Sequence, residues 1–430
     1  MLMYIDPGTG SMLFAILIGI IGAVSYLLKM WIVKIKFLLS GGKAEEASKD
    51  VIPIAFFSDD KRYWSVFEPV CKELDKRNVE VIYLTASEDD PALANPYENI
   101  KAEYIGSGNK AFSRLNFIKA TILVSTTPGL DVLQWKRSKD VKCYIHMLHG
   151  ANEVAGYRMF GVDYYDAVML SGEYQVEDLR YLEKLRSLPE KDVELIGVPY
   201  MDKMVERLKA DTPVGAHERT VLLAPSWGPS SILNKYGERF IDLLINTGYH
   251  IIIRPHPQSY TAEKELMEKL TAKYPETEKL EWNRDNDNYD VLKRSDILIS
   301  DFSGVVFDFC LVYDKPVIYA DTEFDTSPYD FWWLEDIPWT FKALPRIGEK
   351  LTADNLDNIK GLIDGCIENP SYAEARAEVR DETWVHRGEG AARAADYIIK
   401  KYEEYSGRRK ENDGLECYQY SVDRSTEASV

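Results

Sequence analysis

Two stretches of sequence, Arg254-Pro255-His256-Pro257 and Ser300-Asp301-Phe302-Ser303-Gly304-Val305-Val306-Phe307-Asp308, decide the fold of this chain. Each follows a short apolar run, His250-Ile251-Ile252-Ile253 in the first case and Asp296-Ile297-Leu298-Ile299 in the second. Short β-branched runs that stop abruptly at polar residues are typical of buried parallel strands. In open α/β sheets, ligands bind beyond the carboxyl ends of such strands. The sequence therefore predicts one crevice that receives a histidine, an arginine and a serine–glycine turn, which is a site for an anionic group.

The turn at Ser303 and Gly304 precedes an apolar run of helical length that ends before Pro316. Backbone N–H groups in the first turn of a helix have no partner within the helix, and glycine lets a ligand approach them closely. Together with the helix dipole, these donors predict a phosphate-binding site. Asp308 lies on the same helix face as Gly304, where we expect it to accept hydrogen bonds from ribose hydroxyls. The alternative is that Asp301 or Ser303 only caps a buried helix.

The composition limits the classes of partner that the chain can have. It has 430 residues and a formal charge of −18, so there is no basic excess to neutralise the phosphates of nucleic acid. Its five cysteines are scattered without CxxC spacing, which indicates a reducing compartment. Its six histidines show no HExxH or HxxxH spacing, so we expect neither a dedicated metal site nor a cofactor.

The N-terminal region predicts a membrane anchor. Residues 11–36 contain an apolar run long enough to span a bilayer, residues 1–10 precede it, and residues 37–50 form a polar linker. All lysines near the run follow its apolar centre, so the positive-inside rule places the remainder of the chain in the cytoplasm and residues 1–10 outside. A cleaved signal peptide and a buried core helix are the alternatives. We therefore expect a single-pass protein of the cell membrane with a cytoplasmic catalytic domain.

Beyond the linker, predicted strands and helices alternate, which is typical of parallel sheets covered on both faces. A polar segment with proline and glycine, residues 209–219, separates two such sets. The sequence thus predicts an α/β protein with two Rossmann-like domains, residues 51–210 and 219–405, that face a central cleft. Residues 406–430 are polar without periodicity, and we expect a disordered tail.

Four predicted strand ends carry side chains suited to phosphoryl chemistry. His149 follows a strand of the first set, and Ser226, His256 and Ser303 follow strands of the second. A histidine near its ordinary pKa takes a proton from an attacking hydroxyl or, when charged, holds a phosphate oxygen. Arg254 offers a planar fork for two such oxygens. The alternatives are a loop role for His149, bonded to a neighbouring carbonyl, and a simple ion pair for Arg254.

These residues resemble a known family in their order and spacing. The resemblance rests on His149-Gly150, Ala224-Pro225-Ser226-Trp227, Arg254-Pro255-His256-Pro257, and Ser300-Asp301-Phe302-Ser303 with Asp308. This set resembles the CDP-glycerol glycerophosphotransferases of wall teichoic acid assembly.

The resemblance implies a GT-B fold, a CDP-glycerol or similar CDP-polyol donor, and transfer of glycerol phosphate to a hydroxyl of a lipid-linked acceptor, with release of CMP. It implies that His149 is the general base of catalysis. It also implies that His256 and Arg254, with Ser303, hold phosphate, and that Ser226 contacts the nucleotide.

Three positions depart from the family pattern. Gly228 stands where an arginine is usual, Phe302 replaces a tyrosine, and Gly304 replaces a second serine. These departures bear on the identity of the donor more than on the fold. Two other hypotheses stay open: a GT-B glycosyltransferase or sugar-nucleotide epimerase of cell-envelope polysaccharide synthesis, and a scaffold without catalytic activity.

Overall fold

The computed structural model describes residues 51–285 and 287–407. The predicted N-terminal segment, membrane anchor and linker (residues 1–50) and residues 408–430 of the predicted tail lie outside these ranges. Among the residues that the structure describes, no helix is both long and apolar enough to cross a membrane.

The first part of the chain forms a parallel sheet of seven strands. In chain order these are β1 (Ile52–Ser58), β2 (Val81–Thr85), β3 (Ile100–Tyr104), β4 (Ala120–Ser125), β5 (Val141–Met147), β6 (Ala167–Leu170) and β7 (Asp192–Leu195). The order across the sheet is β3-β2-β1-β4-β5-β6-β7, and every pair is parallel. The order reverses between β1 and β4, as in a doubly wound Rossmann-like sheet.

The second part forms a parallel sheet of six strands. These are β8 (Thr220–Leu223), β9 (His250–Ile253), β10 (Leu280–Trp282), β11 (Ile297–Ser300), β12 (Val317–Ala320) and β13 (Gly348–Leu351). They lie in the order β10-β9-β8-β11-β12-β13, again with parallel pairing only. The prediction of an α/β chain with two parallel sheets is confirmed.

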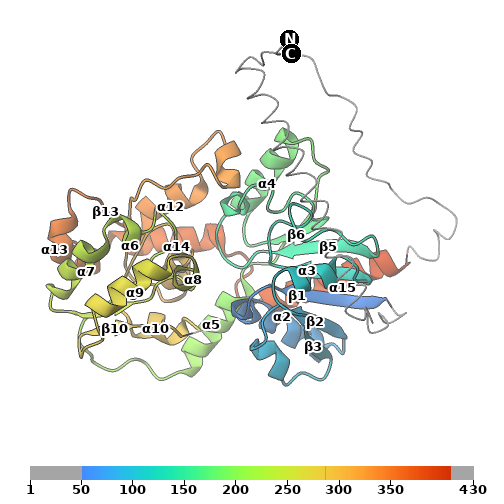
Figure 1. Cartoon of the computed structure of the whole chain (residues 1–430), viewed down its shortest axis with the longest axis horizontal. Helices are drawn as coiled ribbons and strands as arrows, with labels where there is room; N and C mark the ends of the chain where they lie inside the picture. Colours follow the sequence, from blue (N-terminus) through green and yellow to red (C-terminus); the bar gives the residue numbers. More distant parts are fainter. Residues whose placement is uncertain (1–50, 286, 408–430) are drawn as a thin grey trace, which may run out of the picture. The chain divides into compact units, whose positions relative to one another are not determined.

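Helices cover both faces of each sheet (Figure 1). They are α2 (Trp64–Lys76), α3 (Asn109–Leu115), α4 (Glu173–Leu185), α5 (Pro199–Ala210), α6 (Ile232–Lys235), α7 (Gly237–Ile245), α8 (Ser259–Ala262), α9 (Lys264–Lys273), α10 (Tyr289–Arg294), α11 (Val305–Phe307), α12 (Trp339–Ile347), α13 (Ile359–Glu368), α14 (Ser371–Thr383) and α15 (Gly390–Gly407). Along β1, Ile54 and Phe56 enter one core cluster while Ala55 and Phe57 enter another. A strand with both faces buried has no polar alternation, which is why its sequence is a continuous apolar run.

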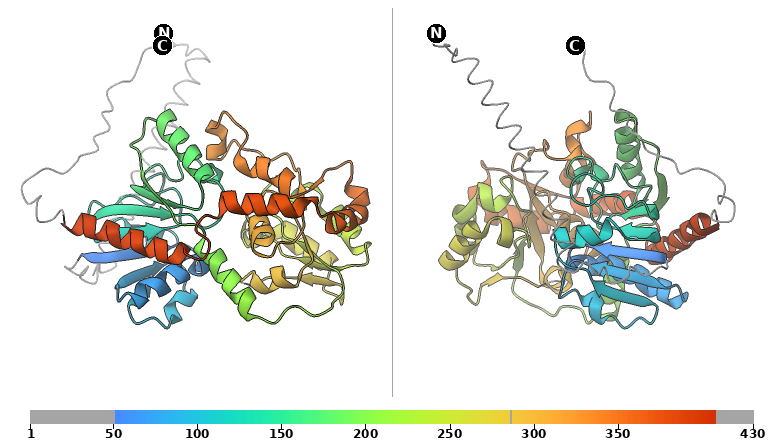
Figure 2. Two further views of the ribbon diagram at one scale, coloured as in Figure 1. Left: turned by 180° about the vertical axis from the view of Figure 1, so that it is seen from behind. Right: turned by 45° about the vertical axis from the view of Figure 1, so that its right-hand side comes forward.

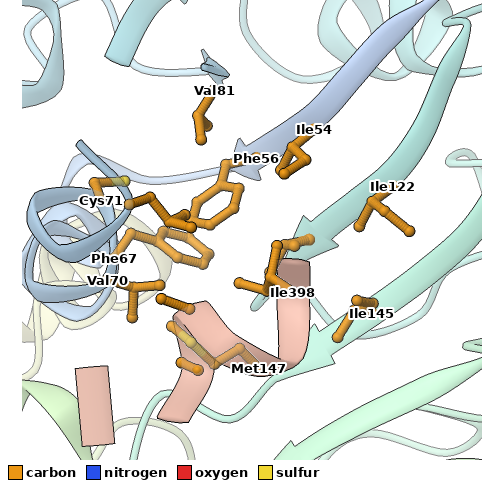
Figure 3. Close-up of a cluster of buried hydrophobic side chains, with 14 of the residues drawn as sticks. Ile54, Phe56, Phe67, Val70, Cys71, Val81, Ile122, Ile145, Met147 and Ile398 are labelled. Carbon is orange, nitrogen blue, oxygen red and sulfur yellow. The ribbon is translucent and has the colours of Figure 1, made fainter. Parts of the chain in front are cut away.

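The last helix, α15, returns to the first sheet. Figure 3 shows Ile398 of α15 in the same cluster as Phe56 of β1 and Phe67 of α2, and the rear view in Figure 2 shows α15 beside the strands of the first sheet. The sequence predicts residues 219–405 as one second domain, whereas the structure packs residues 390–407 on the first sheet. The sequence of α15 predicts an apolar face but does not show which of the two sheets this face packs on. The tertiary structure decides that. Residues 406 and 407, predicted as tail, complete this helix.

The segment between β12 and α12 joins the two parts of the molecule. Asp330 is fully buried, and its carboxylate accepts hydrogen bonds from the backbone N–H groups of Phe160 and Gly161 and from the guanidinium of Arg186. The N–H of Asp330 donates to the carbonyl of Tyr157. Three hydrogen bonds to the buried carboxylate and one from the backbone N–H fix this segment in place against the first sheet.

Candidate functional site

Two cavities meet at the carboxyl ends of the strands. Both are lined by His149 from the loop after β5, by His256 from the loop after β9, and by Ser303 and Gly304 after β11. We call them the basic cavity, of about 550 Å³, which Arg254 and Asp308 line, and the aromatic cavity, of about 580 Å³, which Trp135 and Phe331 line. All seven predicted site residues line one cavity or both, Ser226 on the aromatic side.

His149 is positioned through one ring nitrogen. Its Nδ1 lies 3.1 Å from the hydroxyl of Thr126 and 3.2 Å from that of Tyr157. Within the described part of the chain, its Nε2 has no hydrogen-bond partner. Burial, and to a lesser extent the charge of Arg62, lowers the pKa of His149 to about 4. The imidazole is therefore neutral near pH 7 and has one nitrogen available to a ligand.

A second histidine stands behind the first. The Tyr157 hydroxyl lies 3.1 Å from Nε2 of His146, so it joins the two imidazoles. His146 is fully buried, and its Nδ1 has no partner among the described residues. Burial lowers the pKa of His146 to about 3, so it stays neutral. The direction in which the Tyr157 hydroxyl donates thus affects which nitrogen of His149 carries the proton.

His256 has a defined tautomer. The backbone N–H of Gln258 donates to its Nδ1 at 3.1 Å, so in the neutral ring the proton is on Nε2. Burial, followed by the charge of Arg62, lowers the pKa of His256 to about 4. A neutral ring with Nε2–H is a hydrogen-bond donor. Of the two predicted catalytic histidines, only His149 has a ring nitrogen, Nε2, that is free to accept a proton. His256 instead presents Nε2–H as a donor to an anion.

Arg254 and Arg284 line the basic cavity, and so do the carboxylates of Asp285 and Asp287, whose charges act on Arg254 without a direct ion pair. The guanidinium of Arg254 donates to the side-chain carbonyl of Asn283 and, at 2.8 Å, to the main-chain carbonyl of Asp285. Among the described residues, no carboxylate forms an ion pair with Arg254 or Arg284. The alternative that Arg254 serves a simple ion pair is therefore wrong. Neutral partners fix its orientation and leave its charge for a ligand.

The turn at Ser303 and Gly304 leaves donors unused. Among the described residues, no acceptor bonds their backbone N–H groups or the Ser303 hydroxyl. The following segment is helical through Val312, but it consists of α11 and a π-helical turn, Asp308–Val312, rather than the single helix predicted. No side chain caps α11, so the interpretation of Asp301 or Ser303 as its cap is wrong.

A side chain from the other half approaches Gly304 closely. A β-carbon at this position would lie 2.3 Å from the side-chain oxygen of Asn152, which follows β5. Asn152 also lines both cavities. The glycine that departs from the family pattern thus lets the two halves meet directly beside the unused N–H groups.

Ser226 has an unsatisfied hydroxyl. Its Oγ is buried and has no hydrogen-bond partner within the described residues, although the residue lines the aromatic cavity. Its backbone N–H donates to Asp301 at 2.9 Å, and the other oxygen of Asp301 accepts from the N–H of Ile232 at 3.1 Å. Asp301 therefore fixes the loop after β8, and the Ser226 hydroxyl stays available for a ligand.

Asp308 is already bonded on both oxygens. One accepts from the hydroxyl of Tyr200, and the other lies 3.3 Å from the side-chain nitrogen of Asn288. Burial raises the pKa of Asp308 to about 6, which these two donors only partly offset. A carboxylate has about four acceptor positions, so Asp308 keeps acceptor capacity for a ligand hydroxyl in the basic cavity.

Five contributors have no distinctive signal in the sequence: Asn152, Tyr157, His146, Arg62 and Arg284. Each is a common residue type, and its role depends on where the folded chain places it. The fact that Asn152 and Tyr157 follow a predicted strand end, close after His149, is the one sequence signal that points to them.

Comparison with known proteins gives a consistent picture. Residues 161–331 match the family model described as CDP-Glycerol:Poly(glycerophosphate) glycerophosphotransferase. No curated protein matches the sequence. The structure resembles that of the wall teichoic acid polymerase TagF soaked with CDPG, with a TM-score of 0.55 and 18% sequence identity over 88% of this chain and 98% of that chain.

A putative UDP-N-acetylglucosamine 2-epimerase from Listeria monocytogenes is also similar. Its TM-score is 0.50 at 13% identity, and the match covers 83% of this chain and 98% of that chain. At such identities the likeness to solved structures shows a shared fold. The family match is independent of it and includes the six predicted phosphate- and nucleotide-binding positions after β8, β9 and β11. Over residues 161–331 the chain is therefore similar to the CDP-glycerol:poly(glycerophosphate) glycerophosphotransferase family.

Proposed function

We propose that the chain transfers glycerol phosphate, or a related polyol phosphate, from a CDP-activated donor to a hydroxyl of a lipid-linked cell-wall polymer acceptor, releasing CMP. One observation carries the proposal. His149 and His256, which come from different sheets, line the same cavities as Arg254 and the unused N–H groups of Ser303 and Gly304. This arrangement combines a potential base with several donors for an anion.

The basic cavity suits the donor. Arg254 and the N–H groups after β11 bind the diphosphate, and Nε2–H of His256 adds a further donor. Asp308 accepts from a ribose hydroxyl.

The transfer itself is an in-line displacement. The acceptor oxygen attacks the β-phosphorus, which carries the glycerol, while its proton passes to Nε2 of His149. The bond between the β-phosphorus and the bridging oxygen breaks, and CMP leaves with that oxygen. Positioning and charge stabilisation supply most of the rate in such reactions. His149 must carry its own proton on Nδ1, donated to the hydroxyl of Thr126 or Tyr157, so that Nε2 is free to accept.

The direct test uses the purified full chain with CDP-glycerol and a prenol-linked acceptor, and it measures nucleotide release. CMP that appears only with acceptor, and disappears in His149→Ala, supports the reaction and the base together. Release of a nucleoside diphosphate from a sugar nucleotide would instead support the glycosyltransferase hypothesis. If no cytidine nucleotide stabilises the protein against thermal unfolding, the enzyme hypothesis fails and the hypothesis of a scaffold without catalytic activity remains.

The membrane anchor is part of the proposal. A span at residues 11–36 would hold the cytoplasmic catalytic domain close to a lipid-linked acceptor and raise its effective concentration. Fractionation of the full chain and of a variant that lacks residues 1–36 tests this. The full chain is expected in the membrane fraction after a high-salt wash, and recovery of both proteins in the soluble fraction would refute the anchor.

A further inference from the structure

A turn of the first sheet reaches the basic cavity beside the two histidines. It follows β1, at the point where the strand order of this sheet reverses, and it contains the 3₁₀ helix η1 (Lys61–Tyr63). Ligands of open α/β sheets bind at such a reversal. Arg62 lines the basic cavity together with His149 and His256. The turn therefore adds a cation from the first sheet to the phosphate-binding groups of the second.

Hydrogen bonds and ring packing fix this turn. Asp60 is the N-cap of η1, and its carboxylate accepts from the backbone N–H of Arg62 at 2.9 Å. The hydroxyl of Ser58 donates to the carbonyl of Asp60 at 2.7 Å. The ring of Tyr63 lies against that of His149, with centroids 5.1 Å apart. The turn is thus packed directly on the predicted base.

The guanidinium of Arg62 is paired on one edge. Its Nε lies 2.8 Å from one carboxylate oxygen of Asp60, and its Nη2 lies 3.2 Å from the other. Within the described part of the chain, Nη1 has no hydrogen-bond partner. The ion pair therefore orients the planar group and leaves the N–H donors of Nη1 for an anion.

The ion pair does not cancel the positive charge at the histidines. Burial, followed by the charge of Arg62, lowers the pKa of both His149 and His256 to about 4. The opposite effect of Asp60 on His256 is smaller, and so is the effect of Arg254. Charge effects fall off with distance, so of the two arginines Arg62 is the one closer to the point where the histidines meet.

We infer that Arg62, oriented by Asp60, is a further catalytic residue, and that its Nη1 donates to a non-bridging oxygen of the β-phosphate, the group that is transferred. This inference rests on the proposed function. Arg254 then holds the α-phosphate, which leaves with CMP. Arg62 exchanges no proton in the step: the acceptor proton passes to His149, the bond between the β-phosphorus and the bridging oxygen breaks, and the contact with Nη1 is kept.

The first test needs no turnover. CDP carries the β-phosphate and CMP lacks it, so the ratio of their affinities for the full chain isolates the contacts to that group. By calorimetry, we expect Arg62→Ala to weaken CDP about tenfold and to leave CMP affinity unchanged, which also shows that the variant is folded. Equal weakening of both nucleotides, or of neither, overturns the inference.

A charge-neutral variant separates the contact from the net charge. Arg62→Ala alone leaves the Asp60 carboxylate unpaired, and this charge would by itself repel CDP. The double variant Asp60→Asn with Arg62→Ala keeps the net charge of the wild type and should still bind CDP about fivefold more weakly, again with unchanged CMP affinity. Wild-type affinity for CDP in the double variant would show that Arg62 only neutralises Asp60, and the inference would fail.

Arg114 supplies the matched control. It pairs with Glu103 at 2.6 Å on the surface of the first part of the chain and is not among the described residues that line either cavity. Arg114→Ala should keep the CDP-to-CMP affinity ratio of the wild type. A change as large as that of Arg62→Ala would mean that the ratio does not report on the cavity, and would overturn the assignment.

The second test follows CMP release from CDP-glycerol with acceptor. We expect Arg62→Ala to lower kcat about 10²- to 10³-fold, beyond its effect on CDP affinity, as for the loss of one donor to a developing charge. If the wild type releases no CMP while the affinity ratio responds as expected, the proposed function fails and the contact with the β-phosphate stands. If the wild type releases CMP and neither the ratio nor kcat responds to Arg62→Ala, the proposed function stands and the inference fails.

Discussion

The backbone N–H of Gln258 donates a hydrogen bond to Nδ1 of His256 at 3.1 Å. This contact places the proton of the neutral ring on Nε2 and makes His256 a donor toward the cavity. We expect His256→Ala to lower kcat/KM about 10²- to 10³-fold, as for the loss of one donor to a developing charge. His256→Gln keeps an N–H donor of similar reach and should recover part of the activity. If glutamine is no better than alanine, the ring acts in another way.

His149→Ala should lower kcat by about 10²- to 10⁴-fold and leave CDP affinity unchanged, because a general base acts in the transition state. Steady-state kinetics with calorimetric CDP binding separates the two effects. His386, which is exposed and lines neither cavity, supplies the control His386→Ala. If His149→Ala weakens CDP binding but leaves kcat unchanged, His149 binds the nucleotide and is not the general base.

Tyr157→Phe removes the hydroxyl between His146 and His149 while the ring keeps its place. Thr126 still contacts Nδ1 of His149, so we expect a moderate loss, about tenfold in kcat, with a shifted pH profile of kcat. Tyr144→Phe is the matched control, because that buried hydroxyl accepts from the N–H of Ser138 instead. Identical pH profiles in the wild type and Tyr157→Phe would show that the hydroxyl does not tune the base.

Binding of CDP should not place a second proton on His256. The pKa of His256 is lowered to about 4 by burial and by Arg62, so this ring is neutral at pH 6 in the free protein. A second proton would have to bind Nδ1, which accepts the backbone N–H of Gln258, so protonation would break that hydrogen bond. The contribution of His256 to CDP affinity should therefore stay constant between pH 6 and pH 8.

Calorimetry in buffers of different ionisation enthalpy measures proton uptake directly. His256→Gln should bind CDP with the same proton uptake as the wild type, and the comparison cancels the titration of the nucleotide itself. Greater uptake in the wild type would show that the bound diphosphate protonates His256.

Gly304→Ala places a β-carbon 2.3 Å from the side-chain oxygen of Asn152. We expect Asn152 to be displaced and CDP affinity to fall about tenfold, since the unused N–H groups lie beside it. The double variant Gly304→Ala with Asn152→Ala should regain part of the affinity. Gly365→Ala on α13, where an added β-carbon meets no atom within 4 Å, is the control and should bind CDP normally.

Central strands were predictable, whereas of the four edge strands only β7 was predicted. The runs at β1, β4, β5, β8, β9 and β11 are continuous and apolar because both faces are buried. The missed strands are β3, β10 and β13, and all three lie at sheet edges. β3 alternates Ile100 with Lys101 and carries Glu103, and β13 contains Glu349 and Lys350. An edge strand is partly solvated, so its sequence does not differ from that of a loop.

Local sequence patterns were enough to find the strand ends and therefore the residues that meet at the site, because parallel strands place their carboxyl ends on one edge. His149, Ser226, Arg254, His256 and Ser303 follow from that local rule. The tertiary structure alone decided how they work: which nitrogen of each histidine is free, the approach of Asn152 to Gly304, and the separation of a basic from an aromatic cavity. These features arise from contacts between segments far apart in the chain, and no local pattern of residues encodes such distances.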